Sequence, residues 1–210
     1  MTGLSEYVHI LTALFVIVNP IGAIPLFITF TREQSPSERL VTAKQTAIAV
    51  AVVLVVTLFI GEPLLHFFGI GLPSFRVGGG ILILLMAISM LHARQGGARN
   101  TLQEVVEAED KENVAVVPLA IPMLAGPGAI STTIIYAHRV NTVWGYVVLL
   151  GIVLVVAFGV MAALRLADPI SKRLGRTGIN IATRIMGLIL AAISIEFIAG
   201  GLLQLFPHLA

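Results

Sequence analysis

Six long apolar segments dominate this sequence and leave little of it for anything else. They fall at about residues 8–31, 41–68, 75–92, 114–138, 143–167 and 179–206. Each is close to the roughly 20 apolar residues with which an α-helix crosses the hydrocarbon core of a bilayer. Hydrophobic residues make up 57% of the chain and charged residues 11%, so a soluble domain would expose too much apolar surface to stay dispersed. The sequence predicts an all-α membrane protein with six transmembrane helices.

The composition also limits the partners and cofactors of the chain. A net charge of +2 leaves no clustered basic face, so we expect no nucleic-acid partner. Because the spans are apolar, we expect the lipid bilayer to surround the protein. The chain has no cysteine, no GxxxxGK[ST] nucleotide motif and no His-x-x-x-His pair. We therefore expect no metal and no cofactor, and any transport must be driven by gradients or by another subunit. The oligomeric state stays open.

Lys and Arg are unevenly distributed between the two ends of the predicted bundle. Eleven of the 13 belong to the connections after segments one, three and five: Arg32, Arg39, Lys44, Arg94, Arg99, Lys111, Arg165, Lys172, Arg173, Arg176 and Arg184. Only Arg76 and Arg139 belong to the opposite side. Because basic residues near membrane helices stay in the cytoplasm, the larger group marks the cytoplasmic side. Both termini are then expected on the outer side of the membrane.

The two halves of the chain resemble each other at a constant spacing. GAIP at 22–25 aligns with GAIS at 128–131, and EPLLHFFG at 62–69 aligns with DPISKRLG at 168–175. FRVGG at 75–79 matches TRIMG at 183–187 with a slip of two residues. Because each half has an odd number of spans, the second half must insert into the membrane with the opposite orientation to the first. We therefore expect two inverted three-helix repeats, residues 1–93 and 114–210, joined by an acidic cytoplasmic linker, residues 94–113.

This alignment makes Glu62 equivalent to Asp168, and Arg76 equivalent to Arg184. Within each repeat the acid precedes the arginine across the short connection between two spans. We expect each acid to lie beside the arginine of its own repeat, one pair near each face of the membrane.

Segments one and four carry proline and glycine where a membrane helix should be regular. The first contains FVIVNPIGAIPLF at 15–27, and the fourth contains PLAIPMLAGPGAIS at 118–131. Proline removes a backbone donor and clashes with the preceding turn, and glycine permits a positive φ. Several of these residues close together near mid-span predict that helices one and four are both broken there.

Broken backbone inside a membrane has N–H and C=O groups that hydrocarbon cannot satisfy, so it must be buried in protein or line a polar cavity. These groups are also binding groups, because a half-helix N-terminus attracts a carboxylate and loose carbonyls attract an ammonium group. A small zwitterion offers both, and we expect the two breaks to form one site for it near the midplane. Asn19, Ser131, Thr132 and Thr133 lie at the breaks, where they could cap the backbone or bind substrate.

Glu196 is an acidic residue inside the last apolar segment. A carboxylate within a membrane span is energetically costly and is by default a functional candidate, and burial favours its protonated form. The equivalent position in the first half falls near Ile88 or Ser89, so Glu196 is not a symmetric scaffold element. We take it as a candidate for proton coupling, with a carboxyl group hydrogen-bonded between helices as the structural alternative.

Two motifs and the overall layout carry a family resemblance. FVIVNPIGAIPLF, PLAIPMLAGPGAIST and the six-span pattern resemble the MarC family of bacterial inner-membrane proteins, which includes small neutral amino acid transporters of the SnatA type. The resemblance covers essentially the whole chain. It implies transport of amino acids such as glycine and alanine across the inner membrane, coupled to a proton or sodium gradient. It also implies a substrate site at these positions: Asn19, Pro20, Gly22, Pro25, Pro122, Gly126, Pro127 and Gly128.

The leading hypothesis is therefore a secondary transporter that binds a small zwitterionic substrate and works by alternating access. A membrane channel is the nearest alternative, but the uniformly apolar spans do not suggest a continuous polar pore. A non-transport scaffold protein would have no use for two broken helices. An intramembrane hydrolase would need a nucleophile with a base, and no histidine within a span accompanies Ser131. The exact substrate and the direction of transport stay open.

Overall fold

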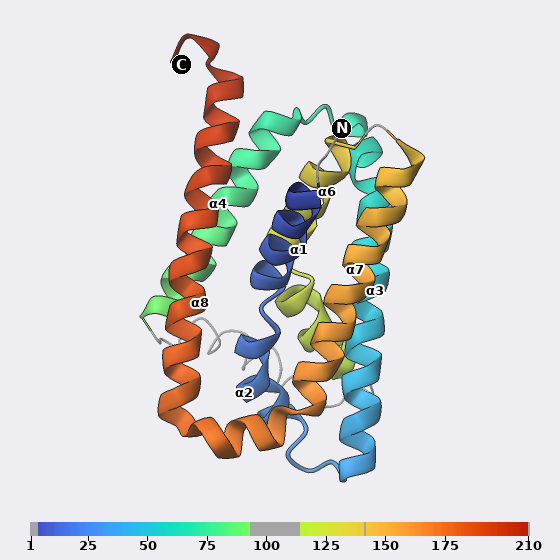
Figure 1. Cartoon of the computed structure of the whole chain (residues 1–210), viewed down its shortest axis with the longest axis vertical. Helices are drawn as coiled ribbons and strands as arrows, with labels where there is room; N and C mark the ends of the chain where they lie inside the picture. Colours follow the sequence, from blue (N-terminus) through green and yellow to red (C-terminus); the bar gives the residue numbers. More distant parts are fainter. Residues whose placement is uncertain (1–3, 93–113, 141, 210) are drawn as a thin grey trace.

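Every regular element in the described part of the chain is a helix (Figure 1), so the predicted all-α class is confirmed there. The computed structural model describes residues 4–92, 114–140 and 142–209. The elements are α1 (Leu4–Val18), α2 (Pro20–Phe30), α3 (Pro36–Phe67), α4 (Leu72–Leu91), η1 (Ala115–Leu124), α6 (Pro127–His138), α7 (Val143–Arg165), α8 (Ala167–Leu205) and η2 (Pro207–Leu209). The predicted linker, residues 94–113, lies outside the described residues.

The long helices have the length and apolarity of membrane spans. Five of them qualify within the described ranges: Ser5–Phe30, Pro36–Phe67, Leu72–Leu91, Val143–Arg165 and Thr177–Leu205. The η1 segment and α6 make a sixth span if they are counted together, although they are bent by 61°. These spans correspond to the six apolar segments of the sequence.

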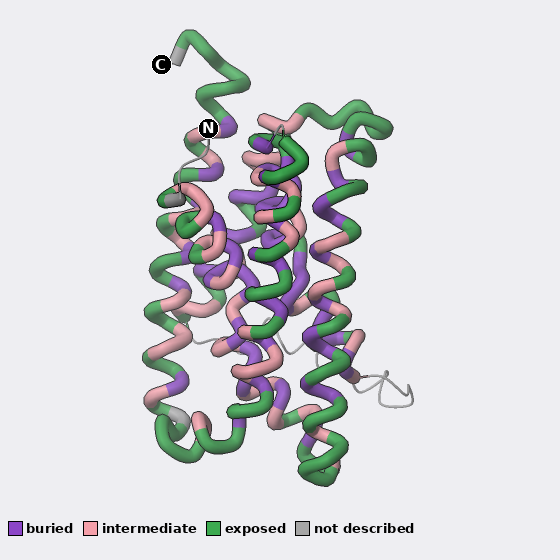
Figure 2. Tube along the Cα trace, turned by 45° about the vertical axis from the view of Figure 1, so that its right-hand side comes forward, coloured by how far each residue is buried: buried purple, intermediate pink, exposed green. Residues whose placement is uncertain are grey.

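The outer faces of the bundle are apolar. Along α3, Ile48, Val52, Val56 and Phe59 are all exposed and recur every three or four residues, so they form one stripe on the helix surface. Figure 2 shows buried residues gathered in the middle of the bundle and exposed ones on its outward faces. A continuous exposed apolar stripe of this kind requires an apolar solvent, and hydrocarbon supplies it.

The broken spans lie in the middle of the bundle. In Figure 1, α1 and α2 lie between α4 and α8 on one side and α3 and α7 on the other, with η1 and α6 behind them. The two central spans contact each other through α1 with α6 and through α2 with η1. Their inward side chains are almost fully buried, among them Ile17, Ile24, Leu119, Leu124 and Ile135. Most of the broken backbone is therefore packed inside the protein, although the side chains of Val117 and Ile121 in η1 are exposed.

Both ends of the described chain lie at the same end of the bundle, shown at the top of Figure 1. An even number of spans gives this arrangement. The α2–α3 and α7–α8 connections lie at the opposite end, and most of the described Lys and Arg lie in them or in the adjoining ends of the helices. We call the end that holds the termini the outer end, and the end that holds these basic connections the inner end.

Glu62 and Asp168 do not pair with the arginines that we expected. At the inner end, Asp168 Oδ2 lies 3.0 Å from Arg39 Nη1. At the outer end, Glu62 Oε1 lies 2.6 Å from His138 Nδ1. The expectation was wrong because each acid reaches a helix of the other half of the chain rather than the next helix of its own half.

Helix α8 includes a sharp turn at Gly175. Its first residues run across the inner end of the bundle, and the span then rises to the outer end (Figure 1). Gly175 has a φ of 60°, a left-handed conformation that glycine adopts without steric penalty. Gly69, at the equivalent position of the first half, has a φ of 67°.

Candidate functional site

The break in the first span is confined to Asn19. Its φ of 52° and ψ of 61° are left-handed, and they separate α1 from α2. The Asn19 side chain accepts a hydrogen bond from Gly22 N–H at 3.2 Å and donates to Met90 Sδ at 3.6 Å. Asparagine tolerates this backbone conformation and is also a favoured N-cap, so one residue both ends the first helix and starts the second.

The predicted unwinding from Asn19 to Pro25 is wrong in its extent. Pro20 is the first residue of α2, where a missing N–H is no loss, and Pro25 lies inside the helix. A single internal proline removes one backbone hydrogen bond and does not melt the turn around it. Of the residues predicted for the site in this span, Asn19, Pro20 and Gly22 lie at the break or in the first turn of α2, and Pro25 lies more than one turn away.

The break in the fourth span is much larger. Within η1, Val117 and Ile121 have extended backbone, with φ and ψ of −127° and 120°, and of −124° and 126°. Each precedes a proline, which disfavours the helical conformation of the residue before it. The segment ends at Ala125, and Gly126 begins α6. The prediction of a broken fourth helix is confirmed over Pro118–Gly126.

The first turn of α6 is an open helix N-terminus. Gly126 is its N-cap, Pro127 its first residue, and no side chain caps it. Helix geometry leaves the N–H groups of Gly128 and Ala129 without intrahelical partners. This differs from α2, whose first turn is capped by Asn19. Of the two half-helices, α6 is the one whose first-turn N–H groups have no side-chain cap.

Gly128 brings the two breaks together. A Cβ on this glycine would lie 2.9 Å from Ile83 Cγ1 and 3.3 Å from Ile17 Cγ2. The start of α6 is thus in close contact with α4 and with the last turn of α1, just before Asn19. Gly128 has room for no larger side chain unless these neighbours move.

The hydroxyl residues predicted for the site divide into two kinds. Thr132 Oγ1 donates to Gly128 C=O, and Thr133 Oγ1 donates to Ala129 C=O, both at 2.8 Å. Both hydroxyl groups therefore donate their hydrogen bonds within α6, although each hydroxyl oxygen can still accept a hydrogen bond. Ser131 instead faces α4, where a Cβ on Gly79 would lie 2.7 Å from Ser131 Oγ. It also lines a cavity of about 460 Å³ along α4.

Glu196 lies away from the breaks. It is exposed on α8, and it forms no hydrogen bond or ion pair with another described residue. This face of α8 turns out of the packed core, so Glu196 is not buried between helices. Its charge does act on Arg76 of α4. Glu196 therefore belongs with the outer half of α4 and α8 rather than with the helix breaks.

Three residues of this region were missed by sequence reasoning. Met90 contacts Asn19, and Ile83 and Gly79 contact the first turns of α6. Methionine and isoleucine in an apolar helix give no sequence signal of such contacts. Gly79 lies in the FRVGG motif of the internal repeat, and that repeat is the one signal that could have drawn attention to it.

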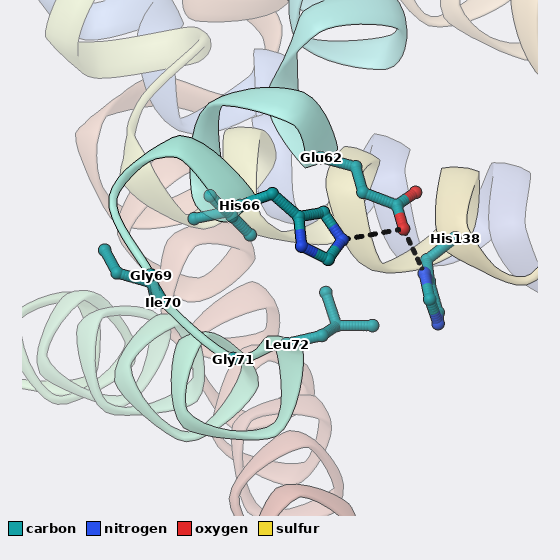
Figure 3. Close-up of a pocket in the computed structure, with 8 residues that line it drawn as sticks. Glu62, His66, Gly69, Ile70, Gly71, Leu72 and His138 are labelled. Atoms are coloured by element: carbon teal, nitrogen blue, oxygen red, sulfur yellow. Dashed lines mark hydrogen bonds and ion pairs between the residues drawn. The ribbon is translucent and has the colours of Figure 1, made fainter.

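Figure 3 shows a small polar cluster at the outer end of the bundle. The Glu62 carboxylate points between His138 of α6 and His66 of α3, at 2.6 Å and 3.8 Å. These residues line a cavity of about 260 Å³ next to the α3–α4 connection. No group of three acidic or histidine side chains among the described residues has a geometry that could hold a metal. The cluster ties the end of α3 to the end of α6.

Comparison with known proteins gives matches over nearly the full length. The family described as MarC family integral membrane protein matches residues 4–206. UPF0056 membrane protein YhcE of Escherichia coli (strain K12) is 40% identical over 206 residues, which cover 97% of this chain and 94% of that protein. UPF0056 membrane protein MJ1677 of Methanocaldococcus jannaschii is 38% identical over 201 residues, 95% of this chain and 97% of that protein. No solved structure matches this chain significantly. With a match of this extent and relatives at this identity, the chain belongs to the MarC family of integral membrane proteins.

Proposed function

We propose that this protein is a secondary transporter of small neutral amino acids that works by alternating access. The observation that carries the proposal is the meeting of two interrupted spans in the middle of the bundle. The open N-terminus of α6, with Gly128 and Ala129, lies against the last turn of α1. Backbone donors and nearby carbonyls at membrane depth suit the carboxylate and the ammonium group of one small zwitterion.

The space around the site favours a small substrate. Ile17 and Ile83 lie close to Gly128, and both are almost fully buried. A glycine or alanine needs little displacement of these side chains, whereas a large side chain would need much more. The apolar walls also disfavour an extra charge, which supports a neutral amino acid.

An inverted repeat is supported by the way in which the spans contact one another. The third span packs on the sixth, the second on the fifth, and the first on the fourth. The contact of α4 with α6 has its counterpart in the contact of α8 with α2. Gly69 and Gly175, which the sequence alignment makes equivalent, both have a positive φ. A twofold axis in the membrane plane produces this pattern of paired contacts.

Two polar contacts at opposite ends of the bundle support alternating access. Glu62 pairs with His138 at the outer end, and its equivalent Asp168 pairs with Arg39 at the inner end. Each contact joins the two halves of the chain. Opening one end while the other stays closed would break one contact and keep the other.

The protein is expected in the inner membrane of a bacterium, with the basic inner end in the cytoplasm and both termini periplasmic. The bias of Lys and Arg toward the inner end supports this orientation. The coupling ion is a proton or sodium, and Glu196 is the candidate residue for proton coupling.

The experiment that tests the proposal is uptake of labelled glycine, alanine, serine and threonine by proteoliposomes. A proton gradient and a sodium gradient are imposed in separate runs. We expect uptake of at least one of the four amino acids above protein-free liposomes, and dependence on one of the two gradients. Well-folded protein that takes up none of them, and that none of them stabilises against heat, would contradict the proposal.

A further inference from the structure

Arg76 is held in an unusual position at the outer end of the bundle. It belongs to the second turn of α4, and its Cζ lies 5.7 Å from the centre of the Phe197 ring on α8. A Cβ on Gly200 would lie 2.7 Å from the same Cζ and 3.0 Å from Nη1. The guanidinium therefore rests directly on the backbone of α8, at a place that only glycine leaves open.

The Nε–H of Arg76 has no acceptor. Of all buried side-chain nitrogen and oxygen atoms in the described residues, it is the one without a hydrogen-bond partner. Leaving such a donor unpaired is costly, and more so when the group is charged. Arginine binds carboxylates through a fork of parallel N–H donors, so the missing partner has the chemistry of a carboxylate.

A second arginine converges on the same place. Arg139, at the C-terminus of α6, has its Cζ 5.5 Å from the centre of the Tyr136 ring. Arg139 and Tyr136 are within electrostatic range of Arg76, as is the acid Glu196 of α8, although no hydrogen bond joins Glu196 to the guanidinium in the described part of the chain. Arg76 and Arg139 are the two basic residues that the sequence assigns to the outer side, and the fold places one near the start of α4 and the other at the end of α6, both at the outer end. Two cations held near each other favour an anion between them.

The arginine pair lies close to the proposed substrate site. Gly79 of α4 touches Ser131, and Arg76 precedes Gly79 by three residues, about 4.5 Å along the helix axis. A ligand that moves inward from the outer end along α4 would meet the arginines before it reaches Ser131 and the start of α6.

We propose that Arg76 and Arg139, with Tyr136 beside them, form a carboxylate-binding site that receives a small amino acid at the outer end of the bundle. The site is separate from the one at the helix breaks. The identity of the ligand as an amino acid rests on the proposed function. The carboxylate specificity rests on the arginines alone.

The test is thermal stabilisation of the purified full-length protein by propionate, with propionamide as the uncharged probe of the same shape. We expect propionate to raise the melting temperature and propionamide to leave it unchanged. Arg76→Gln should need at least about tenfold more propionate for the same shift, which is the size of a lost charge-assisted hydrogen bond. Arg139→Gln should weaken the response in the same direction.

Arg184 offers the matched control. It is the equivalent of Arg76 in the second half of the chain, and it is exposed on α8. Arg184→Gln should respond to propionate as the wild type does.

Two further variants cover the case in which Arg76→Gln does not fold. Arg76→Lys keeps the charge but loses the fork, and Gly200→Ala places a methyl group against the guanidinium. Each should weaken the propionate response while the protein without ligand stays folded. A wild-type protein that propionate does not stabilise, or an arginine variant that responds like the wild type, overturns the carboxylate site. Absence of glycine uptake with an intact propionate response overturns the proposed function instead.

Discussion

Asn19 shows how a single residue interrupts a membrane helix without leaving its polar groups bare. Its left-handed backbone ends α1, its Oδ1 caps the N–H of Gly22, and its Nδ2 reaches Met90. An apolar residue at this place would have the strain of the backbone conformation and none of the bonds. The break is therefore specified by the chemistry of asparagine, and this leads to a stability prediction.

Asn19→Leu should destabilise the protein by about 2 kcal/mol, because it loses the cap and puts a branched side chain in the left-handed region. Asn19→Gly removes the strain and should lower stability by less than about 1 kcal/mol. Melting temperatures in detergent measure both effects. Equal losses in the two variants would contradict the role given to the backbone conformation.

Gly128→Leu should abolish amino acid uptake while the protein still inserts and folds. The new side chain would meet Ile83 and Ile17, and overpacking of this kind costs about 1–3 kcal/mol. Uptake in proteoliposomes and elution as a single species in gel filtration give the two readouts. Gly151→Leu on α7 is the control, because a Cβ there meets nothing within 4 Å. Normal uptake by Gly128→Leu would show that Gly128 does not belong to the substrate site.

Glu196→Gln should flatten the dependence of uptake on an imposed pH gradient more than it lowers substrate affinity. The glutamine keeps the shape of the side chain but carries no exchangeable charge beside Arg76. Initial uptake rates at several substrate concentrations, with and without the gradient, separate the two effects. A variant with the full pH response would exclude Glu196 from coupling.

At the scale of elements, the fourth span is less regular than any other helix of the described bundle. Two extended residues before prolines divide η1, and the chain then bends by 61° into α6. Regular hydrogen bonding would straighten this segment and draw the first turn of α6 away from α1. The irregularity therefore positions the open helix N-terminus.

Pro122→Ala should lower substrate affinity by about tenfold while the melting temperature stays the same or rises. Alanine restores a backbone donor and helix propensity, so the segment becomes more regular and the donors of α6 move. Thermal stabilisation by glycine measures the affinity. Pro63→Ala, at an exposed position near the end of α3, is the control and should bind as the wild type does. Unchanged glycine binding in Pro122→Ala would show that the break in the fourth span does not position the substrate site.

The six spans and the two breaks could be predicted because they depend on local chemistry. Span length follows from apolar runs, and both breaks fall within the segments that prolines and glycines mark in the sequence. The extent of the first break could not be predicted, since Pro20 and Pro25 look alike in sequence but only their places in the helix decide what they do. Partners such as Arg39 for Asp168 depend on how the halves pack, which the sequence does not encode locally.

At the scale of the whole molecule, a polar contact at each end of the bundle joins the two halves of the chain. Arg39 donates to both oxygens of Asp168, at 3.0 and 3.1 Å, and its Nε donates to the C=O of Thr31 at 2.9 Å. This one arginine therefore joins the end of the first span, the start of α3 and the start of α8. The contact is partly exposed, so it contributes at most about 1 kcal/mol, enough to shift a balance between two states without unfolding either.

Asp168→Asn should therefore raise the population open at the inner end by up to about fivefold, the factor that corresponds to that energy. The chain contains no cysteine, so Thr46→Cys gives a single label site without background, at a position buried on the inner half of α3. Its rate of maleimide labelling should rise in Asp168→Asn and in Arg39→Gln. Glu33→Gln removes an exposed acid from the same connection and should leave the rate unchanged. If all three variants label at the wild-type rate, the inner contact does not hold the bundle closed; if Glu33→Gln labels as fast as the others, net charge and not the contact sets the balance.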